Sequence, residues 1–414
     1  MNKSLHTTCC IVGGGPAGMM TGFLLARAGV EVIVLEKHAD FFRDFRGDTI
    51  HPSTIEIMSE LGLLKQFLAV PHQEIEHLHV VYNNTEFEIG DFTHLKVVRP
   101  VLGIMPQWDF LNFVARQALR YKGFHLVMES EVRELIVENN RVVGVRANTP
   151  DGVLEVRANL VIGTDGRSST VGEQAKLKVL PTGVPIDVLW FRFSKRDGDP
   201  PQTLGRFYYG SIMILIDRTD YWQCGFVIEK NGLDKIKAGG LDAFRKQLLE
   251  VSPFLENRVD ELKDWNDIKL LSVAIDHLEK WYCDGLLCIG DAAHAMSPVG
   301  GVGINLAIQD AVATANILYG YLRAGKTMDG EILKLVQQRR ALPTKVIQTI
   351  QATIHKGIAA SRASSVGTPS KLPLPFRLLK MFPVLRRIPA YIVGIGVRSE
   401  HIKSPDFAEL IEQQ

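Results

Sequence analysis

The 414-residue sequence predicts an α/β fold in which a Rossmann-like domain carries an inserted β-sheet domain and a helical C-terminal region. Three observations predict this fold. A glycine cluster separates two short β-branched runs at the start of the chain. The stretch from Asp187 to Ile228 is rich in β-branched and aromatic residues. Two later segments, from about Ile304 to Leu322 and from about Asp329 to Ala360, carry apolar residues at helical spacing.

The first elements form a βαβ unit. Thr7 to Val12 is a short apolar run typical of a strand, and Ala17 to Ala28 has the apolar spacing of a helix. Val30 to Leu35 is a second β-branched run, and it ends in Glu36. Strand, tight turn, helix and strand in this order predict parallel strands joined by a crossover helix.

The turn of this unit, Gly13-Gly14-Gly15-Pro16-Ala17-Gly18, satisfies the G-x-G-x-x-G pattern of dinucleotide-binding sites. Gly13 permits the tight turn, Gly15 lets the backbone approach a pyrophosphate, and Gly18 lets the helix pack closely on the strand. The helix end near Ala17 directs unpaired amides at the anion, and Glu36 is expected to accept hydrogen bonds from the ribose. The pattern alone does not choose between FAD and NAD.

A second glycine-rich stretch lies far downstream, after the apolar run Leu286 to Ile289. Gly290-Asp291 follows that run directly. Asp291, at the end of a strand, is well placed to accept from a sugar-alcohol hydroxyl such as that of the ribityl chain of a flavin. The glycines within Ser297 to Asn305 let the backbone pass close to a flat ring, and a helix beginning near Gly303 directs its positive end at that ring. This stretch favours FAD.

Composition and charge exclude several other classes of protein. Lysine and arginine total 47 against 46 aspartates and glutamates, so no basic excess indicates a nucleic-acid partner. Five cysteines without ligand spacing argue against disulfides and structural zinc, and no metal is expected. The polar start Met1 to Thr8 lacks a secretory signal, and no window contains 18 uninterrupted apolar residues, so a cytoplasmic protein without a transmembrane segment is expected.

The middle of the chain predicts two sheets. Turn signals at Asn139-Asn140 and Pro150-Asp151-Gly152 divide Phe124 to Ile162 into a β-meander. The aromatic residues between Asp187 and Ile228 either pack on one face of a sheet or floor an aromatic-lined pocket, and the two interpretations are compatible. We divide the chain into FAD-binding parts at 1–74, 99–182 and 273–360, substrate-domain parts at 75–98 and 183–272, and a C-terminal extension at 361–414.

These motifs resemble those of the group A flavoprotein monooxygenases, the family of para-hydroxybenzoate hydroxylase, over about residues 7 to 350. Besides the fingerprint with Glu36 and the Gly290-Asp291 pair, Asp165-Gly166-Arg167-Ser168-Ser169 is similar to the central D-G motif of the family, near pyrophosphate and NAD(P)H. The resemblance implies non-covalent FAD, with NADH or NADPH as co-substrate. The chain departs from the family at Gly172, where the motif usually has an arginine, and Arg167 is the candidate substitute.

The resemblance also implies roles for single residues. Arg46 resembles an arginine that contacts the pyrophosphate region, and Gln107, which opens a helix from Trp108 to Arg120, resembles a glutamine beside the cofactor. Pro298 falls where the family places a proline against the reacting face of the flavin, and it is the candidate catalytic residue together with His51, which is expected to contact substrate. His294 is interpreted as a structural histidine or as an acid–base group. The remaining expected cofactor contacts are Lys37, Val132, Gly301, Gly303, Ile304 and Asn305.

The reaction that the resemblance implies is hydroxylation of a hydrophobic small molecule, aromatic or phenolic. NAD(P)H would reduce FAD, and reduced flavin and O₂ would form a C(4a)-hydroperoxide that transfers oxygen. Three alternatives remain open: a flavin reductase or dehydrogenase of an isoprenoid or other unsaturated substrate, a halogenase, and a non-catalytic flavin- or lipid-binding protein. The absence of a W-x-W-x-I-P signature disfavours the halogenase.

The segment from Leu372 to Val397 differs from the rest of the chain. It contains four prolines, many large apolar residues and four basic residues, namely Arg377, Lys380, Arg386 and Arg387. The segment is interpreted either as an extension folded over the core or as a hydrophobic basic surface that touches a membrane or admits a lipophilic substrate. Its prolines exclude one continuous amphipathic helix.

Overall fold

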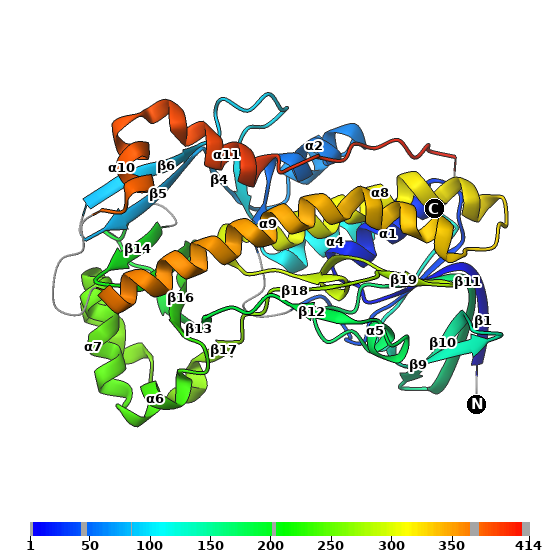
Figure 1. Ribbon diagram of the computed structural model, residues 1–414, viewed down its shortest axis with the longest axis horizontal. Coiled ribbons are helices and arrows are strands. Elements are labelled where there is room, and N and C mark those ends of the chain that lie inside the picture. The colour runs from blue at the N-terminus through cyan, green and yellow to red at the C-terminus, as the bar shows by residue number, and fades with distance from the viewer. Residues whose placement is uncertain (1–2, 43–47, 84, 201–203, 365–371, 408–414) are drawn as a thin grey trace.

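A computed structural model of the chain describes residues 3–42, 48–83, 85–200, 204–364 and 372–407. Two large sheets lie at opposite ends of the molecule, and the long helix α9 (Gly330–Ser364) runs from one to the other (Figure 1). Both chain ends lie beside the first sheet in this view. The fold is the α/β arrangement predicted from the sequence, with a helical C-terminal region.

The sheet beside the chain ends contains eight strands, and its main path is β19-β20-β11-β1-β2-β8. The strands β20, β11, β1, β2 and β8 run parallel, and β9 and β10 form the predicted antiparallel meander with β11. The strand bounds are β1 Lys3–Val12, β2 Val32–Leu35, β8 Phe124–Val127, β9 Glu131–Glu138, β10 Arg141–Thr149, β11 Gly152–Gly163, β19 Tyr282–Cys283 and β20 Leu286–Cys288.

The register of the parallel strands aligns their carboxyl ends. Val12 is paired with Leu35 on one side and with Gly163 on the other, and Gly163 is paired with Cys288. The residues that follow these four positions therefore emerge at one edge of the sheet. Because ligands of open α/β sheets bind outside the carboxyl ends of the strands, three motifs separated by more than a hundred residues meet there.

Three helices cover one face of this sheet. α1 (Pro16–Arg27) packs against both α4 (Gln107–Ala118) and α8 (Val302–Arg323). Ten of the twelve residues of α1 are buried, from Ala17 to Ala26, so this helix is an interior element rather than an amphipathic surface helix.

The second sheet has seven strands in the order β17-β13-β16-β15-β14-β5-β6. Two segments that are distant in sequence build it together. The first supplies β5 (His77–Tyr82) and β6 (Thr85–Asp91). The second supplies β13 (Ile186–Ser194), β14 (Leu204–Tyr208), β15 (Ser211–Asp217), β16 (Tyr221–Glu229) and β17 (Lys269–Leu271). The parallel pairing of β14 with β5 joins the two parts.

Aromatic residues lie on both faces of this sheet, and the largest group lies on one of them. Alternation along the strands places four buried rings on the side covered by α7 (Leu241–Val251), namely Phe191, Phe193, Trp222 and Phe226. The opposite side presents mainly aliphatic residues around Trp190. These four rings follow the first of the two interpretations, aromatic side chains packed on one face of a sheet, because the period of two in a strand places them together in the core beneath α7.

The remaining elements connect the two sheets and cover them. Two small sheets are formed by β3 (Thr49–Ile50), β7 (Leu102–Ile104) and β4 (Gln73–Ile75), and by β12 (Val179–Pro181), β18 (Asp276–Leu278) and β21 (His294–Ala295). Further short helices are α2 (Pro52–Glu60), α3 (Leu64–Leu68), α5 (Thr170–Gln174) and α6 (Leu233–Ala238). None of the helices in the described ranges is long and apolar enough to span a bilayer.

The proline-rich segment folds into three short pieces, as its prolines predict. These are α10 (Leu374–Met381), the 3-10 turn η5 (Pro383–Arg386) and α11 (Arg387–Gly394). They lie against β6 at the edge of the seven-stranded sheet (Figure 1). The segment is therefore an ordered cap on the second sheet.

Candidate cofactor site and active site

The first glycine loop is closely packed at two of its glycines and open at the third. Gly13 has φ +105°, and a Cβ there would lie 2.6 Å from the carbonyl oxygen of Thr164. A Cβ on Gly18 would lie 2.6 Å from the Thr164 hydroxyl oxygen. At Gly15 a Cβ would meet nothing within 4 Å. Gly13 and Gly18 are thus required by the fold, and Gly15 leaves room for a ligand.

The helix that follows this loop has an unsatisfied N-terminus. Gly15 is the N-cap of α1 and provides no side-chain cap, Pro16 follows it, and the first turn has no acidic residue. The free backbone amides and the helix dipole favour an anion at this point. Ala17, next in the helix, is buried, and it faces Gly290 of the second glycine-rich stretch. This arrangement fits a pyrophosphate bound close to Gly15.

Glu36 is positioned by the backbone at the end of β2. Its carboxylate accepts from the Gly14 amide at 2.8 Å and from the His38 amide at 3.1 Å. A carboxylate has about four lone-pair sites, so it can also accept from a ribose hydroxyl. Lys37, the next residue, is exposed, and Val132 is buried in β9. Arg46, which was expected near the pyrophosphate, lies outside the described residues.

Thr164, the residue before the central D-G motif, stabilises the first glycine loop. The Thr164 hydroxyl oxygen lies 2.7 Å from the Gly13 carbonyl and 2.9 Å from the Val12 carbonyl. It bonds across more than 150 residues of sequence. Sequence reasoning missed this residue, because no local pattern marks a threonine that contacts a distant strand.

The D-G motif begins a short helix. Asp165 accepts from the Ser169 hydroxyl at 2.6 Å and from the Val171 amide at 3.2 Å, and burial raises its pKa against these hydrogen bonds. Ser169 caps α5 by accepting from the Gly172 amide at 3.0 Å. A Cβ on Gly172 would lie 3.1 Å from the Ser169 hydroxyl oxygen, so this position is tight. The structure therefore gives Asp165 a local capping role.

Arg167 and Asp291 meet at the edge of the first sheet. The Arg167 Nε lies 3.3 Å from the Asp291 carboxylate, and its Nη2 donates to the Met296 carbonyl at 3.0 Å. Both side chains stay about one-third exposed, 29% for Arg167 and 34% for Asp291. Asp291 is thus accessible to a hydroxyl donor, and it lies next to Gly290 at the carboxyl end of β20.

The second glycine loop also ends in an open helix N-terminus. Gly301, at φ +60°, is the N-cap of α8 and provides no side-chain cap, and the first turn has no acidic residue. A Cβ on Gly303 would meet nothing within 4 Å. Ile304 is buried in the hydrophobic core that includes β1, α1 and α8. Open backbone amides at this helix end fit the polar edge of a flat ring that becomes anionic on reduction.

Asn305 ties the second loop to neighbouring elements. Its side-chain oxygen accepts from the His51 amide and the Thr54 hydroxyl, both at 2.8 Å, and its Nδ2 donates to the Thr49 carbonyl at 2.8 Å. The Asn305 side chain is therefore engaged within the protein. Asn305 was expected to contact the cofactor, and only its backbone is left to do so.

His51 is a buried neutral histidine beside the second loop. Its side chain is 2% exposed, and burial lowers its pKa to about 4, although the carbonyls of Val393, Gly300 and Gly301 partly oppose this shift. The imidazole is therefore uncharged at neutral pH. His51 and Pro298 border the same loop, and Pro298 begins its 3-10 turn.

The long helix α9 holds the second loop from outside. Gln351 accepts from the Ser297 amide at 3.0 Å and donates to the Ser297 and Val299 carbonyls, each at 2.9 Å. The His355 Nε2 lies 2.7 Å from the Ser297 hydroxyl oxygen. These contacts flank Pro298 on both sides. Nothing in the sequence signals them, because the two segments are about fifty residues apart.

A buried charge network supports Gly290. Asp310 is fully buried, and its carboxylate lies 2.6 Å from the His294 Nε2 and 2.9 Å from the Arg340 Nε. It also accepts from the Gly290 amide at 3.1 Å. Burial would raise the pKa of Asp310, but His294 and Arg340 outweigh it and lower that pKa. His294 is buried at 1% exposure and takes part in this network.

A second buried ion pair links Asp48, beside Gln107, to the seven-stranded sheet. Asp48 accepts from the Gln107 amide at 3.2 Å and forms an ion pair with Arg218. Arg218 follows β15 of the second sheet, and its Nε also donates to Gln223 at 3.1 Å. Burial lowers the pKa of Arg218. The sequence does not signal this ion pair, because Asp48 and Arg218 are 170 residues apart.

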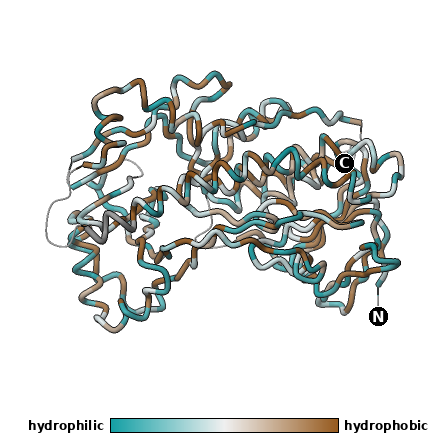
Figure 2. Tube along the Cα trace, viewed as in Figure 1, coloured by the Kyte–Doolittle hydropathy of each residue, from teal (hydrophilic) through white to brown (hydrophobic). Residues whose placement is uncertain are grey.

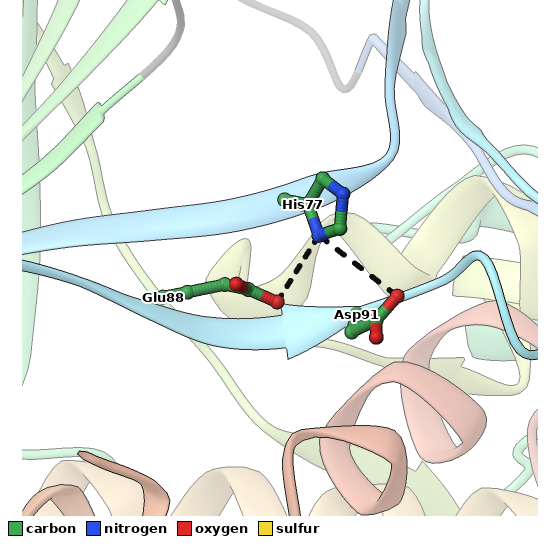
Figure 3. Close-up of side chains that lie close together, drawn as sticks. All are labelled: His77, Glu88 and Asp91. Atoms are coloured by element: carbon green, nitrogen blue, oxygen red, sulfur yellow. Dashed lines mark hydrogen bonds and ion pairs between the residues drawn. The ribbon is translucent and has the colours of Figure 1, made fainter. Parts of the chain in front are cut away.

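One cluster of potential metal ligands lies away from these loops. His77, Glu88 and Asp91 present ligand atoms within 4.8 Å of one another (Figure 3). The His77 Nδ1 lies 3.1 Å from Glu88, and Arg386 donates to the other Glu88 oxygen at 3.0 Å. Because Arg386 already supplies positive charge, we interpret this cluster as a network of ion pairs.

Comparison with known proteins identifies the family. Residues 6–349 match the family model described as "FAD binding domain". The chain is 29% identical over 407 residues to 6-methylpretetramide 4-monooxygenase of Streptomyces rimosus, with 95% of each protein covered. It is 26% identical over 346 residues to digeranylgeranylglycerophospholipid reductase of Thermoplasma volcanium, covering 80% of this chain and 83% of that protein.

Among solved structures, PqsL of Pseudomonas aeruginosa, described as a probable FAD-dependent monooxygenase, has a TM-score of 0.72 at 21% identity. The match covers 88% of this chain and all of that one. The chain belongs to the FAD binding domain family, and its resemblance to the group A flavoprotein monooxygenases is confirmed. It is an FAD-dependent oxidoreductase of that group.

Proposed function

We propose that the protein is an NAD(P)H-dependent monooxygenase that hydroxylates a hydrophobic, aromatic small molecule. In the balanced reaction, the substrate C–H, O₂, NAD(P)H and a proton give the substrate C–OH, water and NAD(P)⁺. The observation that carries the proposal is the convergence of two open helix N-termini, at Gly15 and at Gly301, on one edge of a parallel sheet.

The residues of the chain would hold the cofactor at four places. Gly15 and the α1 amides would bind the pyrophosphate, Glu36 the ribose and Asp291 the ribityl chain. The amides at the start of α8 would face the ring. When bound, FAD accepts a hydride from NAD(P)H and activates O₂.

The substrate would lie between the second glycine loop and the inner face of the seven-stranded sheet. Ile216 of that face shares an apolar cluster with Leu102, Ile104 and Val393. These side chains would exclude water and hold the substrate carbon near the ring. His51, uncharged at neutral pH, would border the substrate without adding charge. An apolar wall of this kind suits a hydrophobic ring system.

A likeness to a 6-methylpretetramide monooxygenase along nearly the whole chain supports a polycyclic aromatic substrate. The main rival is a reductase of an isoprenoid or other unsaturated substrate, supported by the likeness to a phospholipid reductase. The rival needs hydride transfer but no O₂. The two activities therefore differ in whether the enzyme consumes O₂.

Labelled oxygen and anaerobic turnover separate these proposals. The holoenzyme is screened with NADH and NADPH against polycyclic phenols and quinones under ¹⁸O₂, and products are analysed by mass. We expect one ¹⁸O atom per product and no product without O₂. Product formed anaerobically, or aerobically without label, would assign the reductase activity instead.

A further inference from the structure

The C-terminal arm, defined as residues 372–397, gathers exposed apolar side chains at one place. Among the described residues nineteen large hydrophobic side chains are exposed, and seven of them lie within the arm. Their exposed fractions run from 39% to 65%, and they are Leu374, Leu378, Met381, Phe382, Val384, Ile388 and Tyr391. Figure 2 shows hydrophobic stretches along this segment at the margin of the molecule. Such clustering indicates an interaction surface, whereas scattered apolar residues do not.

The opposite side of the arm is fixed to the second sheet. The Phe376 ring lies 5.6 Å from that of Phe87 and 5.9 Å from that of Phe207. Ala390 of α11 is buried at 1% exposure. Arg386 donates to Glu88 within the cluster of Figure 3. The arm is thus held in place, and its exposed side chains cannot turn into this core without breaking these contacts.

The charge of the arm has one sign. It contains four basic residues and no aspartate or glutamate. Glu88 pairs with Arg386, and the Arg387 Nη2 lies 3.1 Å from the His94 Nε2, which itself lies 3.1 Å from Asp91. In the described part of the chain, Arg377 and Lys380 form no ion pair. Two of the four cations that border the apolar surface, Arg377 and Lys380, are therefore not paired with an acidic residue of the described chain.

We propose that the C-terminal arm docks the protein on an anionic lipid surface. Apolar side chains that protrude beside lysine and arginine are the composition of interfacial membrane segments. A lipid surface accepts protruding chains without a matching groove. A second copy of the protein is a poorer partner, because a symmetric contact would bring two positively charged arms together.

The arm also reaches the cofactor site. The Val393 side chain lies beside Gly300 of the second glycine loop, and the Val393 carbonyl faces His51. Docking would therefore bring the second glycine loop close to the lipid. A lipophilic substrate would then have a short path from the lipid to the second glycine loop. This substrate path rests on the proposed function, whereas lipid binding itself does not.

Vesicle binding tests the proposal. The full-length holoenzyme is mixed with phosphatidylcholine vesicles containing about 30% phosphatidylglycerol and with pure phosphatidylcholine vesicles, and cosedimentation is measured. We expect binding to the anionic vesicles that weakens with salt. The double variant Met381→Ser and Phe382→Ser should bind at least about tenfold more weakly, because two interfacial side chains lose apolar area.

The matched control removes exposed apolar area elsewhere. Val137→Ser and Val153→Ser change side chains of the first sheet that are 56% and 38% exposed. This control should bind vesicles like the wild type, and both double variants should retain the flavin spectrum. Equal binding by the two double variants, or none by the wild type, would overturn the proposal. So would a wild-type dimer that the Met381 and Phe382 changes dissociate, because the surface would then belong to a second copy.

Discussion

The two glycine loops that converge on the cofactor site are stabilised in different ways. The first, at Gly13 to Gly18, is held within its own βαβ unit, where Glu36 accepts from the Gly14 amide, and by the hydroxyl of Thr164. The second, at Ser297 to Gly303, is held by side chains of α9 and by Asn305, which also binds His51 and Thr54. The first loop is stabilised mainly by residues close to it in the sequence, whereas the second loop is stabilised by tertiary contacts with distant segments.

This difference predicts that changes in the first loop act on the affinity for FAD, whereas changes around the second loop act on where the flavin ring is placed. The first loop presents a prepared anion site, so changes there should act on FAD binding as a whole. The second loop depends on buried polar contacts with distant segments. Changes in those segments should therefore act on stability and on flavin placement together.

The largest expected effect is at the centre of the first loop. Gly15→Val should abolish FAD binding, because its side chain would fill the space that we propose for the pyrophosphate. Nothing lies within 4 Å of a Cβ there, so the protein should still fold. Flavin content after dialysis and thermal unfolding measure the two effects.

Gly320→Val is the matched control for this loop. Gly320 is exposed near the far end of α8, and a Cβ at this position would also meet nothing within 4 Å. It should bind FAD normally. Full FAD retention by the Gly15 variant would show that the first loop does not contact the cofactor.

The second largest effect concerns the network behind Gly290. Arg340→Met leaves the Asp310 carboxylate buried beside His294 without its arginine partner. We expect the free energy of unfolding to fall by about 3–5 kcal/mol. Urea unfolding measures it. Arg339→Met should lower the free energy of unfolding clearly less, because Arg339 is 30% exposed in its pair with Glu400. Equal losses in the two variants would contradict the role of the buried network.

Next comes a pH effect at the second loop. The pKa of His51 is lowered to about 4 in the folded protein, below the usual 6.5. Between these pH values His51 binds more protons in the unfolded chain than in the folded protein. Its contribution to the free energy of unfolding is therefore complete above about pH 6.5 and is lost as the pH drops towards 4. His51 should contribute roughly 3 kcal/mol to this fall.

The variant His51→Gln isolates that contribution. Its free energy of unfolding, compared with that of the wild type from pH 7 to 4, should lack this part of the pH dependence. The carboxylates titrate alike in both proteins and cancel in the difference. A difference that does not change with pH would show that His51 is not buried and neutral.

The smallest effect is expected at the ribityl position. Asp291→Ala should loosen FAD by about tenfold to a hundredfold, the value of one charge-assisted hydrogen bond. Fluorescence titration with FAD measures it. Arg167→Met removes the neighbouring ion pair while keeping the carboxylate. If Arg167→Met weakens FAD as much as Asp291→Ala, then Asp291 acts through Arg167 instead of binding FAD.

The sequence alone determined the parts of this protein that local geometry encodes. Only glycine fits at Gly13, at φ +105° and close to Thr164, so the fingerprint can be recognised without a structure. Short β-branched runs at fixed offsets from that loop predicted β1, α1 and β2 within a few residues. The prolines of the C-terminal arm predicted that it would be broken into short pieces.

The tertiary structure decided what depends on contacts between distant segments. Thr164, Gln351, Asp310 and the Asp48–Arg218 pair have no local pattern, because each acts on a partner more than fifteen residues away. Alternation along the strands showed which residues share a face, but not which face meets α7, so the sequence left open whether the aromatic rings pack in a core or floor a pocket. A single sequence specifies periodicity and turns, whereas the pairing of faces depends on the packing of the whole chain.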